Sequence, residues 1–460
     1  MNVVIEPGSV SRALPIVPVT AAQLDTFLAT QPASARRWVE STGFKGMPAT
    51  WCGIAGLDGS LSMVLVGVAP TPDLYALSHL PFALPEGDYA LAMGPAMLDP
   101  LHAALGFALG AYQFQKYRKA RRAPARLVLP QGANPVVLRE LVAAIGLVRD
   151  LVNTPTEHMG PAELGDVARE LAQAYGAEYS EIVGDELLAK NFPAIHAVGR
   201  ASHRAPRLLE INWGQASHPR VALLGKGVCF DTGGLNIKPS DGMRWMKKDM
   251  GGAAHALGLA RLIMAHRLPV RLQVLIPAVE NAISANAYRP GEVIVTRSGV
   301  SVEIDNTDAE GRVVLGDAIV YAAESQPTLM MDFATLTGAA RVALGPELPA
   351  LFTNDDALTN AIQLAGRAEL DPVWPMPLWQ PYRSMLDSSV ADMANAGASR
   401  QAGAITAALY LQRFVPDGVP WTHVDVYSWN DGDRPGRPRG GEAQSLRAFF
   451  SFLRSRFFQA

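Results

Sequence analysis

"VALLGKGVCFDTGGLNIKPSDGMRWMKKDMGGAAHALGLARLIM", residues 221–264, predicts the architecture of the chain. It begins as a buried apolar strand, passes through a glycine-rich loop and finishes as a helix. A second segment, "SVEIDNTDAEGRVVLGDAIVYAA" at residues 301–323, repeats the order of strand, loop and helix, with an acidic loop. Strands that alternate with helices indicate a largely parallel sheet covered by helices.

The same alternation extends from about residue 153 onward. Helical stretches such as "PAELGDVARELAQAYG" alternate with short runs such as "RVALLG", "VRLQVLIPAV" and "TLMMDFATL", which are apolar on both faces. We therefore predict an α/β domain with a mostly parallel sheet flanked by helices. In open sheets of this kind, ligand sites gather at the carboxyl ends of the strands.

A smaller α/β domain is expected before it. "LSMVLVGVA" and "YALAM" predict strands, and "DPLHAALGFALGAYQFQKYRK" has the apolar spacing of an amphipathic helix. Pro124, Pro130 and Gly132 then interrupt the chain. "NPVVLRELVAAIGLVRDLVNTP" predicts one long helix that joins the two parts. The predicted domains are residues 1–132 and, with the linking helix, residues 133–460.

Composition is that of an ordinary globular protein. The 460 residues are 49% hydrophobic and carry a formal net charge of −3, so no global attraction to nucleic acid or membrane is expected. Cys52 and Cys229 match no disulfide or thiolate-zinc pattern. Because no stretch approaches the roughly 18 apolar residues of a membrane helix, we expect a cytoplasmic protein.

Carboxylates are crowded in "EIDNTDAEGR", residues 303–312. Two carboxylates about 4 Å apart repel by roughly 4 kcal/mol near a protein surface, so a loop that holds them together needs a compensating cation. The ordinary alternatives are solvated side chains, expected for Glu303 and Asp305, or a favourable charge at a helix start, as for Glu310. The Walker, HExxH and GxSxG patterns are all absent.

The acidic residues of both segments gain meaning as a set. Asp231, Asp249, Asp308 and Glu310 carry four formal negative charges, which two divalent cations would neutralise. Oxygen-rich ligation suits Mg²⁺, Mn²⁺ or Zn²⁺, and paired metals are a recurrent device for hydrolysis.

Four ordered motifs, "GKGVCFDTGG", "NIKPS", "MKKDMGGAA" and "NTDAEGR", resemble the leucine aminopeptidase family of cytosolic dinuclear metallopeptidases. The similarity also includes "RDLVNTP", "ATLTGA" and "AGAITAALYL" and covers roughly residues 148–425. Val313 stands where the family's octapeptide NTDAEGRL ends in leucine. The resemblance implies a metal-dependent aminopeptidase that forms a homohexamer and holds two zinc or manganese ions, with magnesium as a further option.

The resemblance also implies which residues hold the metals. Asp231 and Glu310 would bridge them. Lys226 and Asp249 would complete the tighter site, and Asp308 the more exchangeable one. Lys226 can be a ligand only as a neutral amine, so its pKa must be lowered when metal is bound.

The expected reaction is attack on the first peptide bond by a hydroxide held between the metals. By resemblance, Asp249 helps to bind the free α-amine, and Met246 and Thr335 line the pocket for the first side chain. Lys238 would stabilise the oxyanion. Arg312 would hold a bicarbonate ion that acts as general base.

Specificity and three alternatives stay open. By resemblance, Tyr427, Trp429 and Asn430 would alter the part of the pocket that is built near the carboxyl end, where family members commonly have small and apolar residues, so a preference for leucine is not implied. One alternative is another dinuclear hydrolase such as a phosphoesterase, and another is a degenerate, inactive relative. The third is a DNA-binding regulatory or architectural protein of the same family, which rests on "KYRKARRAPAR" at residues 116–126. That run lacks aromatic interleaving, so a solvated helix end and linker is the ordinary explanation.

Overall fold

The computed structural model describes residues 3–9, 11–120, 122–397, 399 and 401–458. The chain divides into two compact units: unit 1 is Met1–Ala143 with Asp431–Arg439, and unit 2 is Ala144–Asn430 with Gly440–Ala460. Both units are mixed α/β, which confirms the predicted fold class. The predicted linking helix exists as α5 (Pro135–Asn153), and the division between the units falls within it.

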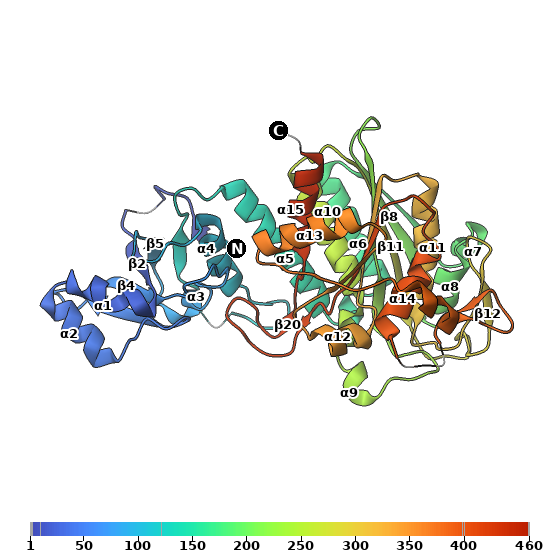
Figure 1. The fold of residues 1–460 in the computed structure, drawn as a ribbon, viewed down its shortest axis with the longest axis horizontal. Coiled ribbons are helices and arrows are strands. Elements are labelled where there is room, and N and C mark those ends of the chain that lie inside the picture. Colours follow the sequence, from blue (N-terminus) through green and yellow to red (C-terminus); the bar gives the residue numbers. More distant parts are fainter. Residues whose placement is uncertain (1–2, 10, 121, 398, 400, 459–460) are drawn as a thin grey trace. The chain divides into compact units, whose positions relative to one another are not determined.

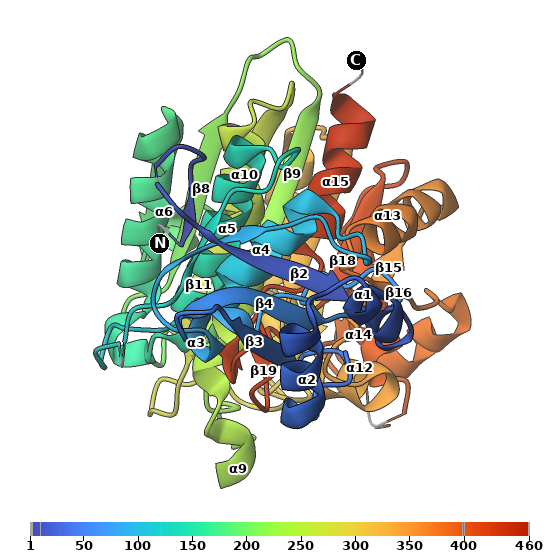
Figure 2. The same ribbon diagram turned by 90° about the vertical axis from the view of Figure 1, so that its left-hand side faces the viewer.

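Unit 1 is built on a six-stranded sheet in the order β1-β6-β5-β2-β4-β3. All neighbours are parallel except β3 and β4, and Figure 2 shows β2, β4 and β3 side by side. Helices α1 and α2 bury apolar side chains against the β2-β4-β3 end of this sheet. The strands are β1 (Val4–Ile5), β2 (Leu14–Val19), β3 (Trp51–Ala55), β4 (Leu61–Gly67), β5 (Asp88–Leu91) and β6 (Arg126–Val128), and the helices are α1 (Leu24–Ala29), α2 (Ala33–Thr42), α3 (Leu80–Ala83) and α4 (Pro100–Gly110).

The amphipathic helix expected over residues 99–119 is shorter in the structure. It is α4, which ends at Gly110. A Cβ at Gly106 or Gly110 would lie 1.9 Å from a backbone carbonyl oxygen, of Leu74 or Ser78 respectively, so close packing requires both glycines. Glycine also disfavours continuation of a helix. The basic run after it lies outside any helix up to β6, and Arg121 lies outside the described residues.

Unit 2 is built on a larger sheet in the order β16-β15-β18-β14-β9-β11-β8-β7, with β10 also paired to β11. Strands β11, β9, β14 and β18 are parallel neighbours, whereas β7 and β8 on one side and β15 on the other pair antiparallel. The strands are β7 (Glu178–Val183), β8 (Arg207–Trp213), β9 (Arg220–Gly225), β10 (Gly227–Asp231), β11 (Arg271–Asn281), β14 (Leu329–Ala334), β15 (Ala350–Thr353), β16 (Trp374–Pro375) and β18 (Trp421–Asp425).

Helices cover both faces of this sheet (Figure 1). Helix α10 packs on β9 and β14 beside α6 and α15, and α13 packs on α15. On the other face α11 packs on β9 and β11 beside α8 and α14. The central strands are therefore buried on both sides, as their continuous apolar runs predict. The helices are α6 (Pro161–Tyr175), α8 (Pro193–Gly199), α10 (Gly251–Ala265), α11 (Glu310–Glu324), α13 (Asp356–Ala368), α14 (Gly403–Gln412) and α15 (Leu446–Phe457).

Shorter elements complete unit 2. Strands β12 and β13 form a small sheet with β17, and β19 pairs with β20. Among the described residues, no helix is both long and apolar enough to span a membrane. The elements are α7 (Glu186–Ala189), α9 (Ser240–Met243), α12 (Gly338–Leu344), β12 (Val293–Val295), β13 (Ser301–Glu303), β17 (Met393–Ala394), β19 (Trp429–Asn430), β20 (Gly440–Gly441) and the 3₁₀ helices η2 (Thr156–His158), η3 (Met246–Met250) and η4 (Gln380–Leu386), with η1 (Ala21–Gln23) in unit 1.

Candidate metal centre

The polar residues predicted for the site gather at the carboxyl ends of the central strands of unit 2. Lys226 directly follows β9, Asp231 is the last residue of β10, and Thr335 directly follows β14. Asp249 lies in η3, and Glu310 begins α11. The parallel pairing of these strands brings loops from distant parts of the sequence to one edge of the sheet.

Lys226 lies at the centre of one half of the cluster. Its Nζ is 2.7 Å from Oδ2 of Asp249 and 2.8 Å from Oε1 of Glu310, and it donates a hydrogen bond to the carbonyl oxygen of Thr335 at 3.1 Å. A Cβ at position 311 would lie 2.5 Å from Cε of Lys226, so only glycine fits beside the lysine stem. The glycine of the NTDAEGR motif is therefore explained by this close approach.

Lys238 occupies the other half. Its Nζ is 2.7 Å from Oδ2 of Asp231 and contacts Oδ1 of Asp308. Asp231 is only 2% exposed, and its Oδ1 accepts hydrogen bonds from the backbone of Gly233 and from Nδ2 of Asn281, both at 2.8 Å. These donors orient one oxygen of Asp231 and leave the other facing Lys238 and Asp308.

Thr307 joins the two loops that carry the carboxylates. Its Oγ1 donates to the carbonyl oxygen of Gly233 at 2.6 Å and accepts from the backbone of Asn236 at 2.9 Å. Asn395 supports the acidic loop from the other side, where its Oδ1 accepts from the backbone of Asp305 at 2.9 Å. Hydrogen bonds of Thr307, together with the contacts of Lys238, thus help to hold Asp231 and Asp308 near each other.

Burial and mutual repulsion change the titration of the carboxyl groups. Burial, with the charge of Asp231 second, raises the pKa of Glu310 to about 8 and that of Asp308 to about 6. Burial opposes the charged form of Lys226 and of Lys238, but the surrounding carboxylates outweigh it and raise both lysine pKa values. Despite burial, the lysines thus hold the pKa of Asp249 below its usual value, whereas Glu310 and Asp308 need more positive charge than the two lysines supply.

The donor set fits divalent cations. Asp231, Asp308 and Glu310 each offer an oxygen, and these oxygens all lie within 4.8 Å of one another. Oδ2 of Asp249, Oδ1 of Asp308 and Oε1 of Glu310 are buried and each contacts a lysine Nζ, whereas Oε2 of Glu310 is buried without a hydrogen-bond partner among the described residues. Buried carboxylates that are incompletely paired are costly unless a cation coordinates them. The residues are thus suited to oxygen-rich ligation.

The remaining predicted residues surround this cluster. Thr335 donates from Oγ1 to Oδ1 of Asp249 at 2.8 Å and is 6% exposed. Arg312 donates from Nη1 to the carbonyl oxygen of Asn395 at 2.9 Å, while its Nε has no partner among the described residues. Met246 begins η3 and is partly buried.

Two residues of the acidic stretch, Glu303 and Asp305, are separate from the cluster. Glu303 accepts a hydrogen bond from Ser388 at 2.5 Å, and Asp305 is exposed.

Sequence reasoning missed Asn281 and Lys248. Asn281 is 1% exposed and holds Asp231, and its position at the end of the long strand β11 could have revealed it. Lys248 precedes Asp249 and is 4% exposed. Burial, more than the neighbouring Arg341, lowers the pKa of Lys248 to about 8, although Asp249 acts in the opposite direction. The position of Lys248 inside the MKKDMGG motif, directly before Asp249, could have indicated that it lies near the site.

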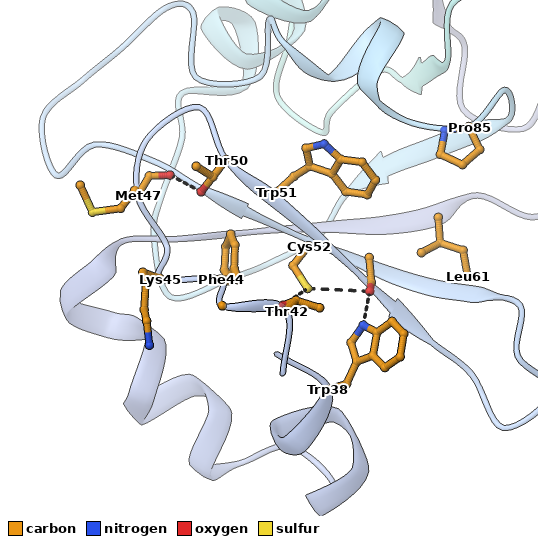
Figure 3. A pocket seen from close by; sticks show the side chains of 12 residues that line it. Trp38, Thr42, Phe44, Lys45, Met47, Thr50, Trp51, Cys52, Leu61 and Pro85 are labelled. Carbon is orange, nitrogen blue, oxygen red and sulfur yellow. Dashed lines mark hydrogen bonds between the residues drawn. The ribbon is translucent and has the colours of Figure 1, made fainter. Parts of the chain in front are cut away.

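A cavity of about 640 Å³ lies in unit 1 (Figure 3). Trp38 donates to the carbonyl oxygen of Gly53 at 2.7 Å, and Thr42 contacts the thiol of Cys52 at 3.4 Å. No Asp, Glu or His lines this cavity, so its lining offers neither a carboxylate nor an imidazole for hydrolysis. Unit 2 therefore carries the candidate centre.

A carboxylate cluster with two lysines, at the carboxyl edge of a parallel sheet, is consistent with the class of metal-dependent hydrolases. The comparisons with known proteins agree. Residues 146–450 match the cytosol aminopeptidase family, catalytic domain, and residues 14–130 match the M17 aminopeptidase, N-terminal domain. The chain belongs to the cytosol aminopeptidase family and is a metal-dependent aminopeptidase, an exopeptidase that hydrolyses peptides.

Similar proteins support this assignment. A probable cytosol aminopeptidase of Roseiflexus castenholzii is 41% identical over 367 residues, which is 76% of this chain and 75% of the relative. The crystal structure of a cytosol aminopeptidase from Coxiella burnetii is 47% identical with a TM-score of 0.95, over 99% of this chain and all of the other. The bottromycin maturation enzyme BotP in complex with Mn is 32% identical with a TM-score of 0.86, over 96% and 99% of the two chains.

Proposed function

We propose that this aminopeptidase removes the amino-terminal residue of peptides with two divalent cations held by Lys226, Asp231, Asp249, Asp308 and Glu310. One observation carries the proposal: carboxylate oxygens from two distant loops converge within 4.8 Å, and the only cations that contact them among the described residues are the side chains of Lys226 and Lys238. When bound, such cations lower the pKa of a water molecule towards about 7 and polarise the scissile carbonyl group.

The chain's own residues have distinct roles in this proposal. Asp249 accepts the substrate's α-amine, and Thr335 orients it through the hydrogen bond to Oδ1. The ammonium of Lys238, which is anchored in the loop after β10, stabilises the negative charge that develops on the carbonyl oxygen. Lys226 acts as a neutral amine. Arg312 would hold a bicarbonate ion, which would supply a general base, and its Nε is free of a hydrogen-bond partner among the described residues.

Metal analysis followed by an activity assay tests this function. The protein purified without added cation should bind about two equivalents of Zn²⁺, Mn²⁺ or Mg²⁺ and then hydrolyse aminoacyl amides. An acetylated α-amine should abolish hydrolysis, since the amine contact defines an exopeptidase. Hydrolysis of a phosphate ester in place of the amide would contradict the proposal and favour the phosphoesterase alternative.

Metal affinity should rise with pH. The folded protein keeps the Glu310 proton up to about pH 8, whereas the unfolded chain loses it near 4.5. The metal-free folded state therefore binds more protons than the unfolded state between these values, so its free energy of unfolding decreases as pH rises through this window. Cations must displace that proton. Calorimetric titration with Mn²⁺ at pH values of about 6, 7 and 8 should show tightening affinity and proton release, and an affinity independent of pH would contradict this.

Further properties belong to the same proposal. Zinc or manganese is the proposed metal, and BotP, a neighbour at 32% identity, is described in complex with Mn. A cytoplasmic location is proposed because relatives are named cytosol aminopeptidases. A homohexamer is proposed from the family resemblance. Nothing in the comparisons supports the DNA-binding alternative.

A further inference from the structure

Two cations flank one aromatic ring beside the candidate metal centre. Nζ of Lys248 lies 5.4 Å from the ring centroid of Tyr427, and Cζ of Arg341 lies 4.4 Å from the same centroid. Lys248 adjoins Asp249 in sequence, and its Nζ is 4.0 Å from Oδ1 of that carboxylate. The three side chains Lys248, Arg341 and Tyr427 are called the cationic wall below.

Hydrogen bonds between strand ends hold the cationic wall in place. Oδ1 of Asp425, the last residue of β18, accepts from the backbone of Leu336 at 3.0 Å, and its Oδ2 accepts from Oγ1 of Thr337 at 2.6 Å. Thr337 caps α12, which carries Arg341. A Cβ at Gly338 would lie 3.5 Å from Nη2 of Arg341, so the guanidinium folds back over the start of this helix. The wall is therefore attached to the ends of β14 and β18.

The positive charge of the wall lacks a matching carboxylate. Arg341 has no ion pair and no hydrogen bond to its side chain within the part of the chain that the structure describes. The carboxylate nearest to Lys248 is Asp249, whose two oxygens are engaged by Thr335 and by Lys226 at 2.8 and 2.7 Å. Contact with an aromatic ring offsets only part of the cost of burying a cation. An anion would offset more.

Bound metals would not remove the excess of positive charge at the cationic wall. Two dications balance the four carboxylates of the cluster, and Lys226 is neutral in the proposed function. The cations that remain are Lys238, Arg312, Lys248 and Arg341, and the anion that remains among the residues discussed is Asp425, whose carboxylate accepts hydrogen bonds from Leu336 and Thr337. A bicarbonate ion at Arg312 neutralises only one of these cations. The surroundings of Asp249 thus keep an excess of positive charge, which favours an anionic substrate group.

We propose that the cationic wall binds a carboxylate of the substrate, namely the side chain of an amino-terminal glutamate or aspartate. The inference rests on the proposed function, in which Asp249 receives the α-amine. Because Lys248 is the neighbour of Asp249, a carboxylate on the same amino acid as the amine lies within its reach. The ring of Tyr427 contacts the methylene groups, and the guanidinium of Arg341 offers a bidentate match to the carboxylate.

The other source of this chemistry is the free carboxyl terminus of a short peptide. That terminal carboxylate belongs to a residue after the scissile bond, whereas the α-amine that Asp249 binds belongs to the residue before it. The two sources are separated by p-nitroanilides, which have no terminal carboxylate, and by a comparison of leucylglycine with leucylglycine amide.

The test measures kcat/KM for glutamyl, glutaminyl and leucyl p-nitroanilides with the Mn²⁺-loaded protein. The expected glutamyl-to-glutaminyl ratio is about 10 or more, and Arg341→Gln and Lys248→Met should each reduce it by about 10-fold or more. Arg261→Gln is the matched control, because Arg261 also stacks on a tyrosine, Tyr175, at 5.7 Å but lies outside the site. It should leave the ratio unchanged.

A binding measurement supplies a readout independent of turnover. Calorimetry should show that the product L-glutamate binds about 10-fold more tightly than L-glutamine, and that Arg341→Gln removes the difference. Folding of each variant is checked by its thermal unfolding temperature.

Several outcomes would overturn the inference. A glutamyl-to-glutaminyl ratio of one or less in the wild type would contradict it. A glutamyl preference that persists in both Arg341→Gln and Lys248→Met would also contradict it. A different result would assign the cationic wall to the carboxyl terminus of the peptide instead of the first side chain. In that case the wild type would prefer leucylglycine over leucylglycine amide, Arg341→Gln would lose this preference, and the glutamyl-to-glutaminyl ratio would be close to one. Failure of the metal-loaded wild type on every aminoacyl substrate would refute the proposed function itself and the inference with it.

Discussion

Lys238→Ala is expected to lower kcat by about 10²–10³-fold with no loss of bound metal. The ammonium of Lys238 lies 2.7 Å from Asp231 and contacts Asp308, so it borders the proposed cations without being a ligand. Its removal deletes a positive charge from the place where the carbonyl oxygen becomes negative. Because that charge also repels cations, metal affinity should stay the same or increase.

Steady-state kinetics and metal analysis on the same preparation check this prediction. Lys190→Ala is the control, since Lys190 is an exposed lysine on the surface of unit 2. KM should change far less than kcat, because an interaction made only in the transition state affects turnover. An unchanged kcat would remove Lys238 from the mechanism, and a loss of metal would assign it to the ligand set.

The second large effect is expected for Lys226→Arg, which should lose the tighter metal and essentially all activity. A neutral lysine amine has a lone pair, whereas a guanidinium cannot be deprotonated in a protein. The site is also too narrow for a larger head group, because the position of Gly311 approaches the lysine stem so closely. The positive charge that the variant retains would remain among the carboxylates and compete with cations.

Titration with Zn²⁺ and Mn²⁺ measures the expected loss of one binding step. Lys226→Met serves as a second variant, since it preserves a similar volume without either a charge or a nitrogen ligand. Both variants should lose the tighter step, whereas Lys190→Arg should retain two. Normal stoichiometry and activity in Lys226→Arg would refute Lys226 as a ligand. Thermal unfolding of each variant shows whether a loss comes from misfolding.

Much of the fold could be predicted from local pattern. The continuous apolar runs of β9, β11 and β14 predict central strands, because a strand buried on both faces has no polar side to show. The helix expected over residues 99–119 was too long, since its apolar spacing continues past Gly110 while close packing on neighbouring backbone depends on that glycine. Spacing describes a helical surface but not the partner that packs on it.

The candidate site shows the same division. Its carboxylates and lysines stand in dense, ordered motifs, so the residue types alone indicate a need for cations. Asn281 has no motif of its own, and only the pairing of β10 with β11 brings it to 2.8 Å from Asp231. Arg341 likewise has no motif of its own. Its role could be inferred only because the structure places the guanidinium, carried by α12, against the ring of Tyr427.

The sequence by itself determined the alternation of strands and helices, the family, and the set of carboxylates and lysines. These depend on residue type and order along the chain. Tertiary structure alone decided which oxygens converge, which of them the two lysines contact, and which cations remain without a carboxylate. Those properties are sums over distances between residues far apart in sequence, and electrostatic energy depends on such distances rather than on separation along the chain.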